Sequence, residues 1–404
     1  MKKTVIYNAQ VVTPTAVLPQ AAVLIRGTSI AEVVQEADPG KRWPDAERID
    51  AEDAYLMPGF IDVHSDNIEN LIQPRATSIM DFELAMREQE KQLANEGITT
   101  MYHSLSLMVP VSGVTKELRQ KDNMLRLVDL IQNFHEGEHL IRHRFHCRYE
   151  ITNLDVYPML EDLIRQGKIQ LLSFMDHTPG QGQYRDLVAY KKLMARESSD
   201  REKDEMIQKR MKREKLTEQQ ICRAAQIAHE MGIAVASHDD DSVEKIDFVS
   251  RQLGADISEF PVELEVAREA KKRGMKVVVG APNVLMGYSH SGNLSALEAI
   301  QNDCADILCS DYYPPAILHA VFRLAERCAL PLWKAVNMAT YHPACALGIS
   351  SEYGSIEPGK YADLILVSKK GSVPVILGVF INGVCVSKLQ YRRDTAAVSG
   401  DFYD

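Results

Sequence analysis

Two side chains that commonly bind metals, His64 and Asp66, follow the short, mostly apolar run at residues 60–63. In a β-strand, side chains two residues apart lie on the same face and can reach one ion. The pair therefore predicts two ligands of a divalent metal at the end of a strand. Taken alone, it has a simpler interpretation, in which His64 forms a hydrogen bond in a turn and Asp66 caps the next helix.

Residue types that bind metals recur at the ends of several later apolar segments. Glu150, Asp176 with His177, His238 and Asp311 each follow such a segment. The carboxyl ends of the parallel strands of a barrel meet on one face, where catalytic groups lie. Packing alone would favour Val, Ile or Leu at these positions. The recurrence therefore outweighs the simpler interpretation and predicts an active site.

Three histidines and three carboxylates suit two divalent ions that share one carboxylate and a water. Imidazole and carboxylate together favour zinc, with manganese or iron as alternatives. Two such ions lower the pKa of a shared water and stabilise developing negative charge. The predicted metal ligands are His64, Asp66, Glu150, His177, His238 and Asp311.

Within this set we assign separate roles. Glu150 is expected to bridge the two ions, and Asp311 is expected to take the proton from the water. Asp311 has an alternative interpretation as a cap or turn residue before Tyr312. The predicted catalytic residues are Asp311, Asp176 and His238.

The segments that carry these residues alternate with helical patterns, which indicates βα units and a parallel sheet. Eight candidate strands suit a (β/α)8 or TIM barrel in an α/β fold. The expected strands are 60–64, 98–102, 144–151, 169–175, 233–237, 257–260, 276–280 and 306–309. The expected helices are 78–96, 116–134, 159–166, 217–231, 262–272, 293–302 and 316–328.

Both ends of the chain are rich in short strand-like segments separated by turns. Strands from opposite ends of a chain can pair, so we predict a small composite β-sandwich domain from residues 1–56 and 346–404. Residues 57–345 are expected to form the metal-dependent barrel. The mixed-charge segment 184–215 interrupts the regular alternation, and is either a solvated helical excursion or a lid over the active face.

The composition narrows the class of protein. Among 404 residues, 45% are hydrophobic and 25% charged, as in globular proteins, and the net charge of −10 argues against a nucleic-acid partner. No segment approaches the roughly 20 apolar residues of a membrane span, and the first residues do not resemble a signal peptide. We expect a cytoplasmic protein. The seven cysteines include no C-x-x-C pair, which disfavours a disulfide framework or a zinc knuckle.

These motifs resemble the amidohydrolase superfamily, which has a metal pincer on the first barrel strand, a bridging carboxylate, two further histidines and a final aspartate. A closer resemblance is to the subfamily of the carbon–phosphorus lyase pathway of phosphonate use. The likeness covers about residues 55–365. Asp66 replaces the second histidine of the usual pincer, and Glu150 stands where many members have a carboxylated lysine. The segments that carry the resemblance are 58–67, 74–75, 97–100, 175–181, 237–240, 280–283, 289–293 and 310–314.

The resemblance implies hydrolysis of α-D-ribose 1-methylphosphonate 5-triphosphate to the 5-phosphate and pyrophosphate. It also implies other phosphonate-pathway enzymes as partners, and it is compatible with a homo-oligomer. An amidase, a deaminase or an N-acyl amino acid hydrolase on the same barrel is an alternative, because fold and metals do not determine the substrate. A metal-free binding protein of this fold is a second alternative.

A triphosphate requires cations or backbone N–H groups, and arginine is preferred for bidentate contacts. Arg148 shares a strand face with Glu150, and its alternative role is a buried ion pair with that carboxylate. The polar run 289–293 precedes an expected helix and suits an anion at its N-terminus, or Asn293 is a plain N-cap. His143 and His146 are expected to be structural. The predicted substrate-binding residues are Arg75, Arg148, Gln181, Asp239, Asn283, Ser289, His290, Ser291 and Asn293.

Overall fold

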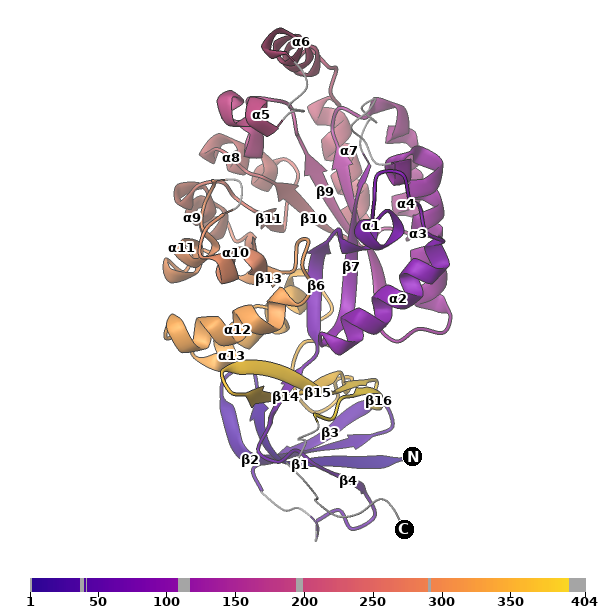
Figure 1. Ribbon diagram of the computed structural model, residues 1–404, viewed down its shortest axis with the longest axis vertical. Coiled ribbons are helices and arrows are strands. Elements are labelled where there is room, and N and C mark those ends of the chain that lie inside the picture. The colour runs from indigo at the N-terminus through magenta and orange to yellow at the C-terminus, as the bar shows by residue number, and fades with distance from the viewer. Residues whose placement is uncertain are drawn as a thin grey trace, which may run out of the picture.

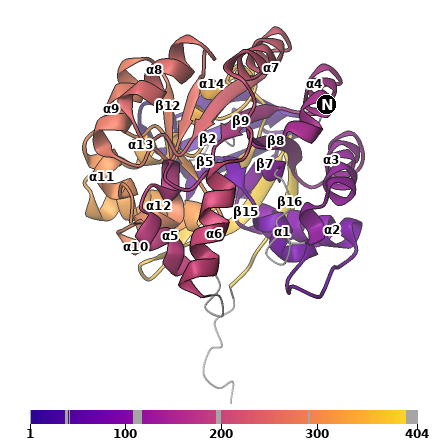
Figure 2. The same ribbon diagram turned by 90° about the horizontal axis from the view of Figure 1, so that it is seen from above.

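The computed structural model of the chain describes residues 2–36, 40, 42–107, 117–193, 199–289 and 292–391. A barrel and a smaller β domain are stacked along the long axis (Figure 1). Seen from above, helices form a ring around the barrel strands (Figure 2). Among the described residues, no helix is both long and apolar enough to cross a membrane.

Eight parallel strands form the barrel, and each is hydrogen-bonded to the next in chain order. Every expected strand is present, so the predicted (β/α)8 architecture is confirmed. A helical connection follows each short apolar strand, and connections of this length allow neighbouring strands to pair in parallel. The strands are β6 Phe60–Ser65, β7 Ile98–Leu107, β8 Arg142–Glu150, β9 Leu171–Met175, β10 Ala234–His238, β11 Ile257–Glu259, β12 Lys276–Gly280 and β13 Ile307–Cys309.

The first and last barrel strands meet at their carboxyl ends. The Asp311 N–H donates to the His64 carbonyl at 2.9 Å, and the Asp66 N–H donates to the Asp311 carbonyl at 3.0 Å. Near the amino ends, a turn inserts between these strands. Ile61 donates to Ala339 and Leu308 donates to Met338. The barrel is therefore nearly closed, and its closing hydrogen bonds lie among the predicted metal ligands.

Helices cover the outer face of the barrel. On β8, Phe145, Cys147 and Tyr149 belong to the large core between strands and helices, so the alternate residues of this strand face the interior. The helices are α1 Asn67–Ile72, α2 Phe82–Asn95, α3 Lys121–Glu136, α4 Tyr157–Arg165, α5 Leu187–Leu193, α6 Asp200–Met211, α7 Glu218–Glu230, α8 Val243–Arg251, α9 Leu264–Lys272, α10 Ala281–Met286, α11 Ala296–Gln301, α12 Ala316–Arg327, α13 Leu332–Asn337 and α14 Tyr341–Ala346.

The barrel interior changes from apolar to polar along the strands. A separate apolar cluster includes Ile61 of β6, Leu171 of β9, Ile257 of β11 and Ile307 of β13. Each of these residues precedes the polar residue at or just beyond the end of its strand. The apolar interior therefore supports a polar layer at the carboxyl end.

Strands from both ends of the chain form the β domain, as predicted. They make one mixed sheet in the order β16-β15-β14-β5-β1-β2-β3, with β4 beside β1. A shared apolar cluster contains Ile6 and Val23 from the first strands and Leu364 and Phe380 from the last. The strands are β1 Lys3–Val12, β2 Val17–Arg26, β3 Ser29–Val34, β4 Glu47–Asp50, β5 Tyr55–Pro58, β14 Leu364–Lys370, β15 Val373–Ile381 and β16 Val384–Lys388.

The passage from the β domain into the barrel requires a glycine. A Cβ atom at Gly59, between β5 and β6, would lie 2.2 Å from a methyl carbon of Thr99 on β7. The predicted domain boundary between residues 56 and 57 falls inside β5, which pairs with β14 in the β domain. That boundary stays a prediction, because hydrogen bonding alone does not divide the chain into independent units.

A buried ion pair joins the two parts of the molecule. Arg142, at the start of β8, forms an ion pair with Asp363, and both side chains are almost fully buried. The same guanidinium donates to Asn382, and its carbon lies 4.3 Å from the centre of the Tyr353 ring. The amino end of the barrel is thus anchored to the β domain by a charge with several partners.

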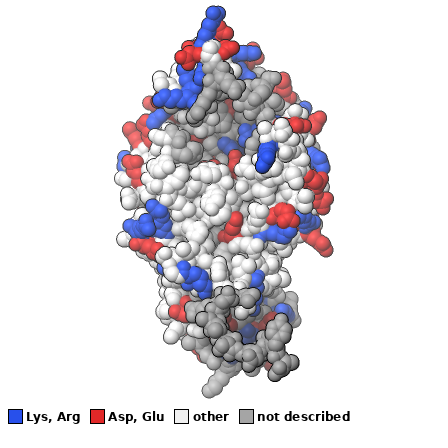
Figure 3. Space-filling model, viewed as in Figure 1, with Lys and Arg blue, Asp and Glu red and all other residues white. Residues whose placement is uncertain are grey.

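The mixed-charge segment forms α5 and α6, beyond the carboxyl ends of the strands (Figure 1). Ser199 and Glu202 form a capping box at the start of α6, which explains why so polar a sequence is helical here. Ile207 is the buried residue of this helix. Charged groups of both signs gather at the tip of the molecule formed by α6 (Figure 3).

Candidate active site and metal centre

A cavity of about 160 Å³ opens at the carboxyl end of the barrel. Its lining comes from β6, β8, β10 and β12 and from connections that follow barrel strands, including those after β9, β11 and β13. Gln183, which sequence reasoning did not select, also contributes. Nine predicted site residues line this one cavity, namely His64, Asp66, Arg148, His238, Asp239, Asn283, Ser289, Asn293 and Asp311.

Three of the side chains form a compact group suited to a metal ion. Ligand atoms of His177, His238 and Asp239 all lie within 4.8 Å of one another. Asp239 Oδ2 is 2.9 Å from His238 Nδ1 and 3.8 Å from His177 Nε2. All three atoms are buried, and among the described residues none has a hydrogen-bond partner outside this group. Nitrogen and oxygen atoms in this state are suited to bind a divalent cation, because imidazole and carboxylate are its usual ligands in proteins.

Glu150 contacts this group through His177. Its Oε2 lies 2.7 Å from His177 Nδ1, and its Oε1 accepts the His177 backbone N–H at 3.2 Å. A carboxylate at Nδ1 places the ring proton there and leaves the Nε2 lone pair available to a metal. Sequence reasoning expected Glu150 to bridge two ions. In the structure it orients a predicted ligand, and bridging stays a prediction.

His64 has a partner that sequence reasoning missed. Its Nδ1 lies 2.8 Å from Oε1 of Glu259, the last residue of β11, and both side chains are buried. His146, expected to be structural, contacts the Val63 carbonyl and the Ser173 hydroxyl. Glu259 could have been found by the rule that selected the other residues, since it is an acidic residue at the end of an expected strand.

Asp311 and Asp239 line the same cavity, but their pKa values are shifted in opposite directions. Burial and the nearby Asp66 raise the pKa of Asp311 to about 7. Burial also acts to raise the pKa of Asp239, but His238 and His177 outweigh it and lower that pKa to about 2. Carboxylates whose pKa values differ in this way suit different chemical roles. Asp311 suits a proton acceptor near neutral pH, and Asp239 suits a permanently ionised ligand.

Both aspartates adopt left-handed backbone conformations, with φ of 58° at Asp311 and 51° at Asp239. Residues other than glycine rarely adopt this conformation, and strain of this kind concentrates at functional sites. At Asp239 the unusual turn places a side chain immediately after β10 beside the histidine that precedes it. Strand alternation would have pointed the two side chains to opposite faces.

Arg148 brings a positive charge into the cavity. Its Nη2 donates to His238 Nε2 at 3.2 Å, and its buried Nε lacks a partner. The alternative from sequence was an ion pair with Glu150. Among the described residues, Arg148 bonds to His238 and forms no ion pair with Glu150. It therefore keeps donor capacity for a further anionic group.

The remaining predicted residues lie elsewhere. Asp176 forms an ion pair with Lys215 at 2.7 Å and accepts the Thr178 N–H at 3.0 Å. The side chains of Arg75 and Gln181 are exposed, and neither lines the cavity. Their roles stay predictions. His290 and Ser291 fall outside the described residues.

The charged excursion lies against the site through aromatic rings. The Tyr184 ring centre is 5.7 Å from that of His177, and the Tyr190 ring of α5 is 4.7 Å from that of Tyr184. Arg210 of α6 donates to the Tyr190 hydroxyl. The excursion thus touches a predicted metal ligand, and a function as a lid stays a prediction.

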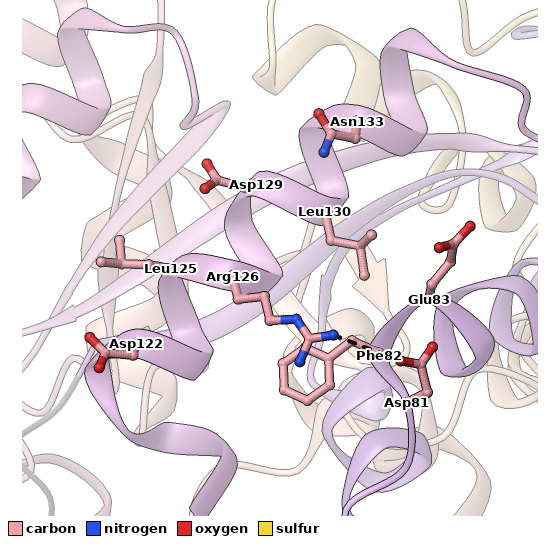
Figure 4. Close-up of a pocket in the computed structure, with 9 residues that line it drawn as sticks. All are labelled: Asp81, Phe82, Glu83, Asp122, Leu125, Arg126, Asp129, Leu130 and Asn133. Carbon is pink, nitrogen blue, oxygen red and sulfur yellow. Dashed lines mark ion pairs between the residues drawn. The ribbon is translucent and has the colours of Figure 1, made fainter.

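A second cavity, of about 530 Å³, lies between α2 and α3 (Figure 4). Arg126 extends over the Phe82 ring at 4.5 Å and forms an ion pair with Asp81 at 3.7 Å. No side chain that lines this cavity is buried without a hydrogen-bond partner. Among the described residues, this cavity therefore differs from the one at the carboxyl end of the barrel, where buried polar atoms lack a partner.

Comparisons with known proteins agree with this arrangement. The sequence profile of the Amidohydrolase family matches residues 55–386. Alpha-D-ribose 1-methylphosphonate 5-triphosphate diphosphatase of Escherichia coli (strain K12) is 33% identical over 355 residues, which cover 84% of this chain and 89% of that protein.

Solved structures of low sequence identity share the fold. N-acetylglucosamine-6-phosphate deacetylase from Pasteurella multocida has a TM-score of 0.63 at 14% identity, covering 94% of this chain and 98% of that chain. Dihydropyrimidinase from Brevibacillus agri has a TM-score of 0.60 at 16% identity, covering 96% of this chain and 95% of that chain.

Proposed function

Because the chain belongs to the amidohydrolase family, and is a hydrolase on that ground, we propose that it cleaves α-D-ribose 1-methylphosphonate 5-triphosphate into the 5-phosphate and pyrophosphate. In this reaction water adds to phosphorus and one phosphoanhydride bond breaks. The observation that carries the proposal is the 33% identity to the E. coli diphosphatase along 84% of this chain. We further propose that the protein acts beside other enzymes of phosphonate breakdown.

The proposal includes two divalent metal ions, with zinc favoured by the donor set. His177, His238 and Asp239 would hold one ion, since their ligand atoms are close together and include orphaned ones. His64, Asp66 and Asp311 are proposed for the other, because all three line the cavity. When bound, such ions polarise a phosphoryl oxygen and make water a better nucleophile.

The chain's own residues supply the proton transfer and the charge balance. Asp311 lines the cavity at the closing point of the barrel, so its carboxylate would accept a proton from the water. Arg148, with a buried and unpartnered Nε, would bind a phosphate oxygen. Asn283 also lines the cavity, and its buried Oδ1 lacks a partner. The amide oxygen would accept a hydrogen bond from a hydroxyl of the sugar.

A panel of substrates tests the proposal. Release of pyrophosphate would be measured with the ribosyl triphosphate and with nucleoside triphosphates, and amide hydrolysis would be measured with a cyclic amide and with an N-acyl amino acid, each with and without a chelator. We expect fastest release from the ribosyl triphosphate and loss of activity with chelator. Hydrolysis of the amides without pyrophosphate release would instead support the amidase alternative.

A further inference from the structure

A buried carboxylate below the cavity contacts the first histidine of the site. Glu259 ends β11, its side chain has no exposed surface, and its Oε1 lies 2.8 Å from His64 Nδ1. Its other oxygen, Oε2, is buried and has no hydrogen-bond partner. Burying an ionised carboxylate costs several kcal/mol unless it is compensated, so this position needs an explanation.

The contact determines which nitrogen of His64 carries the proton. A carboxylate oxygen at this distance suits the acceptor of a hydrogen bond from a neutral imidazole, so the contact favours His64 Nδ1 as the donor. The ring then carries its lone pair on Nε2, and His64 lines the cavity. Metal-binding histidines commonly donate their other ring N–H to a carboxylate, which fixes the ring and strengthens it as a ligand.

The nearby His146 does not neutralise Glu259. Its Nδ1 lies 3.0 Å from the Val63 carbonyl, which can only accept, so the ring proton is on Nδ1. Its Nε2 then accepts from the Ser173 hydroxyl at 2.9 Å, and is 3.7 Å from Glu259 Oε2. In this state His146 is uncharged and presents a lone pair to Glu259.

Positive charge for Glu259 must therefore come from elsewhere. In the described part of the chain, its ion-pair partners are His64 and His146, with no lysine or arginine among them. A divalent ion bound to His64 would supply that charge through the imidazole.

We propose that Glu259 is a positioning residue, which holds His64 in the Nδ1–H form and raises its affinity for a divalent ion. The inference rests on the metal-dependent hydrolase activity proposed above, and it deepens that function by one residue. Ligand atoms of His64, His146 and Glu259 also lie within 4.8 Å of one another. In the proposal Glu259 lies beside the metal and not within the set of ligands, because its Oε1 is 2.8 Å from His64 Nδ1 and the other nitrogen of that ring is left for the ion.

Zinc and cobalt binding test this role without any substrate. Glu259→Gln keeps an oxygen that can accept from His64 but removes the charge, so zinc affinity should fall about 10-fold. Glu259→Leu removes the acceptor too, and the fall should approach 100-fold. Affinity would be measured by competition with a chromophoric chelator. At saturating cobalt, the absorption bands of Glu259→Gln should keep their positions, because the ligands are unchanged.

Glu90→Gln is a matched control. Glu90 of α2 is also a buried glutamate beside a histidine, with its Oε2 3.4 Å from His143 Nε2, but it lies on the outer side of the barrel. This variant should lose stability in denaturant while keeping zinc affinity. Equal zinc losses in Glu90→Gln and Glu259→Gln would overturn the proposal, as would unchanged affinity in Glu259→Gln.

Shifted cobalt bands in Glu259→Gln would make Glu259 a direct ligand and would also overturn the proposal. If Glu259→Leu does not fold, Glu259→Gln still decides the question. A wild-type protein that binds zinc but releases no pyrophosphate would contradict the proposed substrate and leave the role of Glu259 intact. A wild-type protein that binds neither metal would contradict both.

Discussion

Arg142 and Arg148 lie on the same strand and the same face, at opposite ends of β8. At the amino end, Arg142 bonds to Asp363 and Asn382 and stacks on Tyr353. At the carboxyl end, in the described part of the chain, Arg148 forms one hydrogen bond, to His238, and its buried Nε has no partner. One strand thus carries a fully partnered arginine and an incompletely partnered one.

The difference separates structural from functional polar groups. Among the described residues, the charges at the amino end hold two parts of the molecule together. Those at the carboxyl end leave hydrogen-bonding capacity unused, at a cost that stability alone does not explain. Buried polar atoms without a partner also occur elsewhere, as at Glu96 and Thr100. The feature that marks the end that binds a ligand is therefore the gathering of such atoms around one cavity.

The largest effect should come from removing metal. If the orphaned donors at the carboxyl end hold divalent ions, chelation followed by dialysis should reduce pyrophosphate release by roughly 1,000-fold or more, since metals supply several kcal/mol of transition-state stabilisation. Adding zinc back should restore activity. Full activity in metal-free protein would show that the polar groups at the carboxyl end do not act by binding metal.

Arg142→Ala should cause the largest loss of stability. Asp363 would be left as a buried charge without its partner, so the free energy of unfolding should fall by about 3–5 kcal/mol. Denaturant unfolding would measure the loss, with activity of the folded protein retained. The double variant with Asp363→Ala should recover part of it. A stable Arg142→Ala protein with impaired catalysis would reverse the assignment of the two ends.

Arg148→Ala should have the opposite signature. Loss of a charged hydrogen bond to the substrate should lower kcat/KM for the triphosphate by roughly 10- to 100-fold, mainly through KM. The free energy of unfolding should change by less than about 1 kcal/mol. Arg148→Lys should retain part of the affinity. A loss of stability matching that of Arg142→Ala, with KM unchanged, would show that both arginines are structural.

The smallest effect is expected at the cavity between α2 and α3. The side chains of Arg126 and Asp81 are both largely exposed. Arg126→Ala should change the free energy of unfolding by no more than about 1 kcal/mol and leave pyrophosphate release unchanged. A clear loss of activity here would mean that partnered surface groups can also mark a functional site.

The sequence supplied the barrel and most of the cavity lining, because both follow from local patterns. Each strand is a short apolar run, and the parallel arrangement places the run ends together. The partners of a side chain can lie far away in the sequence, and such partners could not be predicted. Asp176 pairs with Lys215 from the end of the charged excursion, and Glu259 meets a histidine 195 positions earlier. No periodicity indicates such pairs.

Backbone conformation explains a second class of differences. Asp239 is predicted to bind substrate, and its left-handed turn also places it among side chains that could hold a metal ion, so both roles stay predictions. Arg75 was chosen for its charge and its place after the pincer, but the chain there is exposed. Charge and proximity in sequence do not reveal which way a loop turns.

The hydrogen bonds that join Asp311 to His64 and to Asp66 have a consequence for synthesis of the chain. These bonds join the first barrel strand to the last. In the same way, β5 pairs with β14, which comes much later in the chain. On the ribosome, neither the cavity nor the β sheet can be completed until the C-terminal strands have emerged. Assembly is therefore a late event dominated by long-range contacts, which fold slowly. A nascent chain that stops before β14 would expose the unpaired edge of β5.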